Sequence, residues 1–370
     1  ASIEKVIPIA LRTNLLFSGL FTILAGFCPE MLMRIFTNDA ALVASGSQYL
    51  RAVALSYVLC GISQVYLILL KNTGHAAVSS RISSTAVVLN IILNAILIYG
   101  LCGAPALGIR GAAYATVAAR VVELIWAYLE TKKPERVRIL WNRLFSSAGK
   151  ILSEDFWRYT LPVLAASLVW GIAYVLYSVI MGHMGSDAVA ANSITSIAKS
   201  LLSCLIRGVS GGAGVLIGNL LGANELEKAR EYGGRLSHLS IAIGIVTGGL
   251  LVLISPAIVH FAPLSDTAAE YMQYMLLFCG LNLMAQSVNT TVLDGIFCAG
   301  GDAKFDMQGN IGAMWCFSVP LGFLAAFWLK LPVMVVYCIV NLDEIVKLPA
   351  VYHHYKKYIW VRNITRDVED

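Results

Sequence analysis

Long apolar stretches dominate the chain, and short junctions rich in glycine, proline or charge separate them. Each stretch reaches or exceeds the roughly 20 residues that an α-helix needs to cross the hydrocarbon core of a bilayer. The longer ones indicate tilt or extension beyond the bilayer. The pattern predicts ten membrane-spanning helices, at residues 6–36, 42–70, 80–101, 108–129, 156–181, 189–221, 236–261, 268–298, 307–329 and 333–352.

Composition indicates the same class. Hydrophobic residues make up 58% of the chain and charged residues 13%, and the mean hydropathy is +0.73. A soluble domain carries about 25% charged residues. We therefore expect an all-α polytopic membrane protein in contact with the lipid bilayer. The net charge of +5 fits basic loops beside anionic lipid head groups and does not indicate nucleic acid.

Several positions near the start of the chain recur 227 residues later without a gap. This repeat predicts two homologous helical bundles. The apolar segment at 156–221 precedes the second copy, and its counterpart would lie before residue 1. We therefore expect a twelve-helix plan from which this chain lacks the first two helices. The recurring residues are Pro29 and Pro256, Asp39 and Asp266, Ala41 and Ala268, Gly74 and Gly301, and Ala76 and Ala303.

Charge predicts the orientation of the lobes. One set of alternate loops holds 19 Lys or Arg and the other set holds 3. The positive-inside rule predicts that the basic loops and both ends of the chain lie in the cytoplasm. We expect the protein in the plasma membrane. The expected parts are an N-terminal lobe at 1–130, a cytoplasmic linker at 131–155, a six-helix lobe at 156–357 and a tail at 358–370.

Nothing in the sequence favours an enzyme. The eight cysteines are scattered singly, without CxxC or Cys/His spacing, so we expect no metal site and no cofactor. A membrane-embedded enzyme would need a nucleophile–base or metal-ligand set at membrane depth, whereas the six histidines fall at predicted helix ends or in loops. No obligate protein partner is evident either.

Separated motifs in a consistent order resemble the multidrug and toxic compound extrusion (MATE) transporters. The resemblance implies two six-helix lobes and export of small organic, often cationic, compounds by alternating access, coupled to H⁺ or Na⁺. A lipid-linked saccharide flippase of the same superfamily is the alternative, and it would show a strongly cationic cleft. The motifs are residues 90–94 (NIILN), 107–116 (LGIRGAAYAT), 188–192 (AVAAN), 221–229 (LGANELEKA) and 300–305 (GGDAKF).

The coupling acids of that family do not transfer to this chain. Sodium-coupled members carry a glutamate about eight residues after a helix-opening proline, and the count from Pro162 reaches Trp170. A family aspartate falls near Val288 or Asn289. Another branch keeps its key aspartate in the first helix. Either Asp294 or a helix before residue 1 is therefore expected to hold the coupling ion.

Polar residues follow one face of the predicted helix 268–298. Asn282, Gln286 and Asn289 stand at helical spacing, and Asp294 lies about 120° around the helix from Asn282, at the border of this stripe. The stripe fits a cavity wall that binds substrate or ion, and it fits equally well interhelical hydrogen bonding. For Asp294 we favour function, because a lone carboxylate is costly in a membrane.

Two cations and several aromatic residues occur in the two preceding helices. Lys199 is deep enough to need a partner or an aqueous cavity, and Asp294 is one possible counter-charge. Arg207 fits snorkelling toward an interface. Trp170 and Tyr174 could hold organic cations by cation–π contact or could simply pack.

Charged residues also occur at comparable depth in the last helix of each predicted lobe. The pattern predicts gating or structural ion pairs near the cytoplasmic side, and we favour the structural role. These residues are Arg120 and Glu123 in the first lobe, and Asp343, Glu344 and Lys347 in the second.

Overall fold

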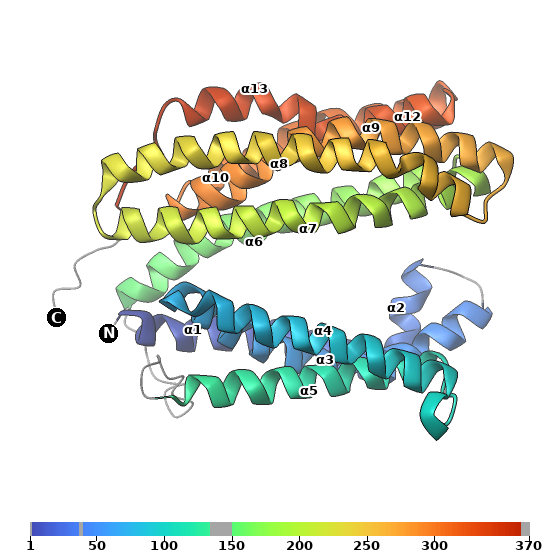
Figure 1. Cartoon of the computed structure of the whole chain (residues 1–370), viewed down its shortest axis with the longest axis horizontal. Coiled ribbons are helices and arrows are strands. Elements are labelled where there is room, and N and C mark those ends of the chain that lie inside the picture. Colours follow the sequence, from blue (N-terminus) through green and yellow to red (C-terminus); the bar gives the residue numbers. More distant parts are fainter. Residues whose placement is uncertain (1, 37–39, 134–149, 364–370) are drawn as a thin grey trace. The chain divides into compact units, whose positions relative to one another are not determined.

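Helices account for all regular secondary structure in residues 2–36, 40–133 and 150–363, the part of the chain that the computed structural model describes. The chain divides into two compact units, Ala1–Phe156 and Trp157–Asp370 (Figure 1). Most of the predicted linker, and also Asp39, lies outside the described residues. The predicted all-α fold class is confirmed.

Unit 1 is built on a long central helix, α3, which packs against α1 and α5, while α4 packs on α5 (Figure 1). Hydrogen bonds join these helices, since the Thr22 hydroxyl donates to the Ala54 carbonyl at 3.1 Å. The elements are α1 (Ser2–Phe27), α2 (Pro29–Phe36), α3 (Ala40–Leu70), η1 (Lys71–His75), α4 (Ala76–Tyr99), η2 (Leu101–Gly103) and α5 (Ile109–Thr131).

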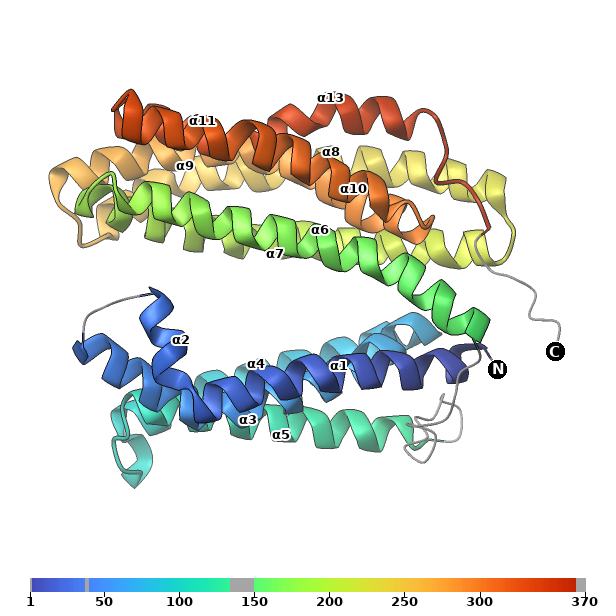
Figure 2. The same cartoon turned by 180° about the vertical axis from the view of Figure 1, so that it is seen from behind.

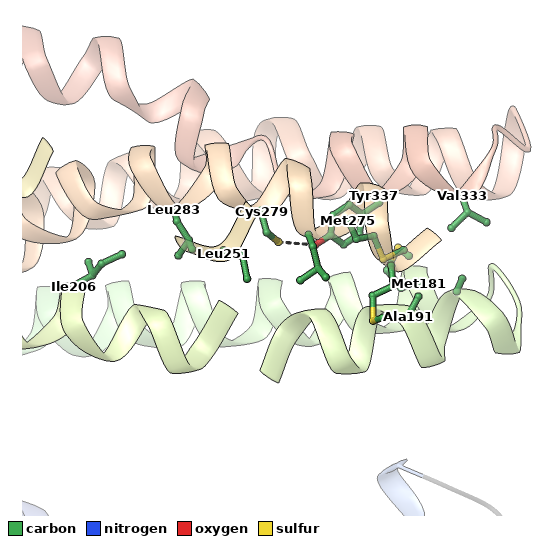
Figure 3. Packing of buried hydrophobic residues seen from close by; sticks show 12 residues of the cluster. Met181, Ala191, Ile206, Leu251, Met275, Cys279, Leu283, Val333 and Tyr337 are labelled. Atoms are coloured by element: carbon green, nitrogen blue, oxygen red, sulfur yellow. Dashed lines mark hydrogen bonds between the residues drawn. The ribbon is translucent and has the colours of Figure 1, made fainter. Parts of the chain in front are cut away.

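In unit 2, α13 packs on α9, and η4 packs on α7 and α9. Helices α7, α8 and α9 pack tightly against one another (Figure 2). Its main apolar core joins these helices to α12, and Figure 3 shows Met275, Cys279 and Tyr337 meeting there. Cys279 Sγ and the Tyr337 hydroxyl lie 2.9 Å apart. The elements are α6 (Lys150–Gly182), α7 (Ser186–Gly222), α8 (Leu226–Phe261), α9 (Asp266–Thr290), η4 (Thr291–Phe297), α10 (Ala303–Asn310), η5 (Ile311–Ser318), α11 (Val319–Phe323), η6 (Leu324–Trp328), α12 (Val333–Val340) and α13 (Asp343–Tyr355).

Eight helical stretches in the described ranges are long and apolar enough to cross a membrane, compared with ten predicted spans. One stretch, Val43–Tyr99, contains two predicted spans, because only the short segment η1, whose backbone is kinked and non-helical at Thr73 and Gly74, separates α3 from α4. The last predicted span, 333–352, is divided into α12 and α13, and each of these is shorter than a bilayer-crossing helix.

The 227-residue repeat is visible in the backbone. Gly74 and Gly301 both have positive φ, +84° and +71°, which glycine adopts without steric cost. The following residues, His75 and Asp302, share φ −105° and ψ 35°. Helices α4 and α10 begin one residue later. The two halves therefore use the same turn to start equivalent helices.

The segment after α13 folds back onto the end of unit 2. Trp360 is fully buried in a cluster with residues of α7, α8, η4 and α13. Arg362 holds this segment in place by donating to the carbonyls of Gly300 and Gly301 at 3.0 and 2.9 Å.

The phenol of Tyr355 packs in the same region. Burial is the larger cause, and the nearby Tyr358 the smaller one, that raises the pKa of Tyr355 to about 12, so this phenol stays neutral.

Helices α8 and α9 are in close contact at Gly248. A β-carbon at this position would overlap the carbonyl oxygen of Gly280, which belongs to the α9 backbone. The next residue, Gly249, has no atom within 4 Å of the position that its β-carbon would take. Glycine at Gly248 therefore permits the close contact between the two helices.

We predict that Gly248→Ala destabilises the protein by about 1–3 kcal/mol, because the added methyl group must push α9 away from α8. The measurement is the apparent melting temperature of the detergent-solubilised protein. Gly249→Ala is the matched control and should leave the melting temperature unchanged or slightly raised. Equal melting temperatures for the two variants would contradict the packing described here.

Candidate functional site

Unit 2 contains a polar cleft formed by two adjoining cavities. The first cavity has a volume of about 360 Å³ and is walled by α6, α7, α9, η4, α10 and α13. The second has a volume of about 110 Å³ and lies between α6, α7, α9 and the α12–α13 break. The two cavities share Trp170, Arg207, Gln286 and Glu344, so we treat them as one polar cleft.

The cleft gathers most of the predicted site residues. Asn289, Asp294 and Lys347 line the first cavity, whereas Tyr174, Lys199 and Asp343 line the second. Asn282 lines neither cavity and is fully buried. Arg120 and Glu123 belong to unit 1 and form a separate arrangement.

A π-helical turn brings Asp294 to the cleft. The turn, η4, continues α9 without a break, and Asp294 lies within it as an exposed side chain. Regular 100° steps would leave Asp294 at the border of the polar stripe, but a π-turn contains an extra residue and so changes the phase of the helix. Asp294 consequently lines the same cavity as Gln286 and Asn289.

Helix α7 supports this turn. The hydroxyl of Ser210 donates to the carbonyl of Thr290, the residue before η4, at 2.8 Å. A β-carbon on Gly295 would lie 2.8 Å from the carbonyl oxygen of Ser210, so glycine allows the two backbones to approach. In the described part of the chain, the carboxylate of Asp294 makes no hydrogen bond or ion pair.

Helix α12 is separated from α13 by an amide-rich junction. The side chain of Asn341 donates to the carbonyl of Tyr337 at 3.0 Å, which competes with helix continuation. The carbonyl of Asn341 itself accepts from Asn282 Nδ2 at 2.6 Å. Lys199 then donates to Asn282 Oδ1 at 2.8 Å. Asn282 therefore connects a cation on α7 to the helix break.

This contact differs from the pairing considered in the sequence analysis. Lys199 contacts an amide oxygen and lines the second cavity, whereas Asp294 lines only the first. No ion pair joins these two residues within the described ranges. The reason is geometric, because the neutral Asn282 on α9 already faces Lys199.

The acids at the start of α13 surround one buried ammonium group. Lys347 Nζ lies 3.1 Å from Glu344 Oε1 and 3.8 Å from Asp343 Oδ2, and its side chain is 5% exposed. Asn289 Nδ2 donates to the backbone carbonyl of Glu344 at 2.7 Å and to Glu344 Oε2 at 2.8 Å. The other amide atom, Asn289 Oδ1, is buried without a hydrogen-bond partner beside the first cavity.

Two further polar residues extend this network, and the sequence analysis did not single them out. Asn310 accepts from Lys347 at 3.2 Å and donates to Asp306 Oδ1 at 3.1 Å. The predicted span 307–329 leaves Asp306 just outside the membrane helix. The structure starts α10 at Ala303, so Asp306 and Asn310 stand one turn apart on the cavity wall. Their i, i+4 spacing was the available signal.

Aromatic side chains line the side of the cleft that α6 provides. The rings of Trp170 and Tyr174 stack with centroids 5.4 Å apart. The guanidinium of Arg207 lies 5.8 Å from the Trp170 ring centroid. Arg207 therefore points into the cleft, contrary to the expectation that it snorkels toward an interface.

The ion pair of unit 1 is buried in a different way. Glu123 is 1% exposed and accepts from Arg120 Nη1 at 2.7 Å and from the hydroxyl of Ser63 at 2.5 Å. Ser63 lies on α3, so the pair joins α5 to α3. This geometry is that of a satisfied contact between helices.

The helical architecture and the polar cleft define a multi-pass membrane transporter. A family model, MatE, matches residues 2–96 and 162–324. The chain belongs to the MatE family of transporters, and it is therefore not an enzyme.

Individual relatives are distant but match over most of the chain. The Uncharacterized transporter YisQ of Bacillus subtilis is 20% identical over 97% of this chain and 78% of its own length. The Probable multidrug resistance protein YoeA of the same organism is 22% identical over 94% of this chain and 77% of its own length. A solved structure of a MOP superfamily transporter from Pyrococcus furiosus superposes with a TM-score of 0.85 at 18% identity, covering 97% of this chain and 79% of the other.

We predict that Lys347→Met destabilises the protein by about 3–5 kcal/mol, because it leaves Asp343 and Glu344 buried without a counter-charge. Thermal unfolding in detergent measures this loss. Lys304→Met, which removes an exposed ammonium on the same unit, is the matched control.

The double variant Lys347→Met/Glu344→Gln should recover part of the loss, since it removes one of the unpaired charges. If Lys347→Met melts at the temperature of the control, the network does not stabilise unit 2.

Proposed function

We propose that this protein is a secondary active multidrug exporter that moves organic, often cationic, compounds out of the cell in exchange for H⁺ or Na⁺. Membership of the MatE family and the multidrug resistance names of several relatives support this function. The observation that carries the proposal is the polar cleft in unit 2, which combines charged groups with aromatic walls inside apolar helices.

Asp294 is the proposed coupling group. Its carboxylate faces the first cavity, where Arg207 and Lys347 also lie, but it makes no ion pair or hydrogen bond in the described residues, so a proton or a sodium ion can neutralise it there. Carboxylate and amide oxygens are also the hard ligands that such cations prefer, and the unpartnered Asn289 Oδ1 lies beside the same cavity. The proposed cycle therefore alternates the cleft between organic substrate and coupling cation.

Alternating access in this proposal involves two lobes, at residues 1–130 and 156–357, joined by the linker 131–155 and followed by a tail at 358–370. Both ends of the chain lie in the cytoplasm, and the protein resides in the plasma membrane. Discontinuous helices commonly form the binding sites of transporters, and the break between α12 and α13 is such an element. Asp343, Glu344 and Lys347 hold that break, and Arg120 with Glu123 hold unit 1.

The flippase alternative is not favoured. A lipid-linked saccharide would require a strongly cationic cleft. Here the cleft combines three cations with four acids, which are Lys199, Arg207, Lys347, Asp294, Asp306, Asp343 and Glu344.

We predict that Asp294→Asn reduces efflux of a cationic dye to the level of cells without the protein, because a neutral amide neither takes up and releases a proton nor offers the negative charge that a coupling cation neutralises. The measurement is dye efflux from cells that lack their own exporters and express the full-length protein. Glu270→Gln removes an exposed carboxylate of α9 outside the cleft and should leave efflux unchanged.

Membrane vesicles with an imposed sodium gradient at equal pH, or with a pH gradient and no sodium, then identify the coupling ion. Full efflux by Asp294→Asn would remove this carboxylate from the mechanism.

A further inference from the structure

We infer that the side of the cleft between α6 and α7 binds the carboxylate of an aromatic organic anion, with Arg207 as the principal anchor. The inference rests on the proposed exporter and specifies a substrate class for it. It predicts that this cleft recognises aromatic acids in addition to the organic cations considered above.

The acids of the cleft are largely satisfied within the protein. Glu344 is bonded to Lys347 and Asn289. Asp306 accepts from Asn310, and Asp343 lies 3.8 Å from the same ammonium group of Lys347. Among the described acids of the cleft, this leaves Asp294 as the carboxylate without a hydrogen bond or ion pair.

The two cations on α7, Lys199 and Arg207, have most of their hydrogen-bond donors free. Lys199 has three N–H donors, and its one hydrogen bond goes to the neutral amide of Asn282. Arg207 has five donors, and within the described residues it has a ring contact but no hydrogen bond or ion pair. Charges at membrane depth are costly unless they find partners.

Asp343 and Glu344 also line the second cavity, but Lys347 and Asn289 already hold them, and Asp294 lines only the first cavity. The free donors of the two cations in the second cavity therefore point to an anionic ligand.

Aromatic surfaces lie next to these cations. Trp170 and Tyr174 stack on one another and both line the second cavity, which also contains Arg207 and Lys199. A flat ring can lie against these two side chains while a carboxylate attached to it reaches the guanidinium. Arginine suits this role because its planar fork binds a carboxylate through two parallel hydrogen bonds.

The spacing on α7 assigns different roles to the two cations. Lys199 and Arg207 are eight residues apart, which corresponds to about 12 Å along a helix. Lys199 is directed to Asn282, whereas Arg207 lies over the Trp170 ring, so we place the carboxylate at Arg207 and the ring of the ligand toward Lys199. Lys199 then attracts the anion or binds a second acceptor on the ring, such as a hydroxyl group.

The test is isothermal titration of the purified full-length protein with three ligands of the same shape: 2-naphthoate, 2-naphthamide and 2-naphthylmethylammonium. Hydrogen bonds to a charged group favour the anion, so 2-naphthoate should bind about tenfold more tightly than 2-naphthamide. Arg207→Gln should remove this preference and leave 2-naphthamide binding unchanged. Arg207→Lys should retain part of it, which separates loss of charge from loss of folding.

Two further variants complete the design. Lys304→Gln removes an exposed cation outside the cleft and should bind 2-naphthoate like the unaltered protein. Trp170→Leu should weaken all three ligands by a similar factor, because each loses the same stacking surface. Equal affinities for 2-naphthoate and 2-naphthamide would overturn the inference, as would tightest binding of the ammonium ligand.

Binding is measured without an ion gradient, so this test is independent of the transport assay. A protein that exports dye but shows no preference for 2-naphthoate would retain the proposed function and lose this inference. A protein that prefers 2-naphthoate but exports no dye would retain this inference and lose the proposed function.

Discussion

The structure depends on one constraint: inside a bilayer, water cannot satisfy a polar group, so each interruption of a helix needs a partner from the protein. The two interruptions at the cleft obey this rule. Ser210 donates to the carbonyl before the π-turn η4, and Asn282 donates to the carbonyl at the α12–α13 break. Backbone irregularity is therefore tolerated where a neighbouring helix supplies a short polar side chain, and these same places carry the charged residues.

Charges in the cleft follow the same rule to different degrees. Lys347 is enclosed by two acids and an amide, so its ammonium group is paired within the protein. Arg207 has only a ring contact, and Asp294 has no bonded partner in the described residues. Removing one partner from a buried pair of charges is costly, so the paired charges hold their helices in one arrangement, whereas unpaired charges facing a cavity remain available to ions and ligands. The same cleft thus contains a group of paired charges around Lys347 and two charged groups, Arg207 and Asp294, that are free to bind ions or ligands.

Much of this organisation could be predicted from the sequence, because bilayer thickness and the repeat leave strong periodic signals. The turn at Gly74 and Gly301 shows how a repeated residue corresponds to a repeated backbone conformation. Two details could not be predicted. The π-turn that aims Asp294 depends on contacts with α7 and does not follow from helical periodicity. The other is the direction of Arg207, for which the sequence suggests snorkelling. Arg207 instead contacts the ring of Trp170, which lies 37 positions away in the sequence and is not visible in the local pattern around Arg207.

The segment after α13 has a consequence for the order of assembly. Trp360 completes an apolar cluster whose other members come from α7, α8, η4 and α13, and the carbonyl oxygen of Trp360 lies against Gly300. During synthesis, α7, α8 and η4 are made well before Trp360, whereas α13 precedes it by only a few residues. Until the segment with Trp360 docks, the apolar cluster at this end of unit 2 is incomplete, and the carbonyls of Gly300 and Gly301 lack their hydrogen bonds from Arg362. This cluster of unit 2 is therefore completed only when the segment that contains Trp360 docks against it.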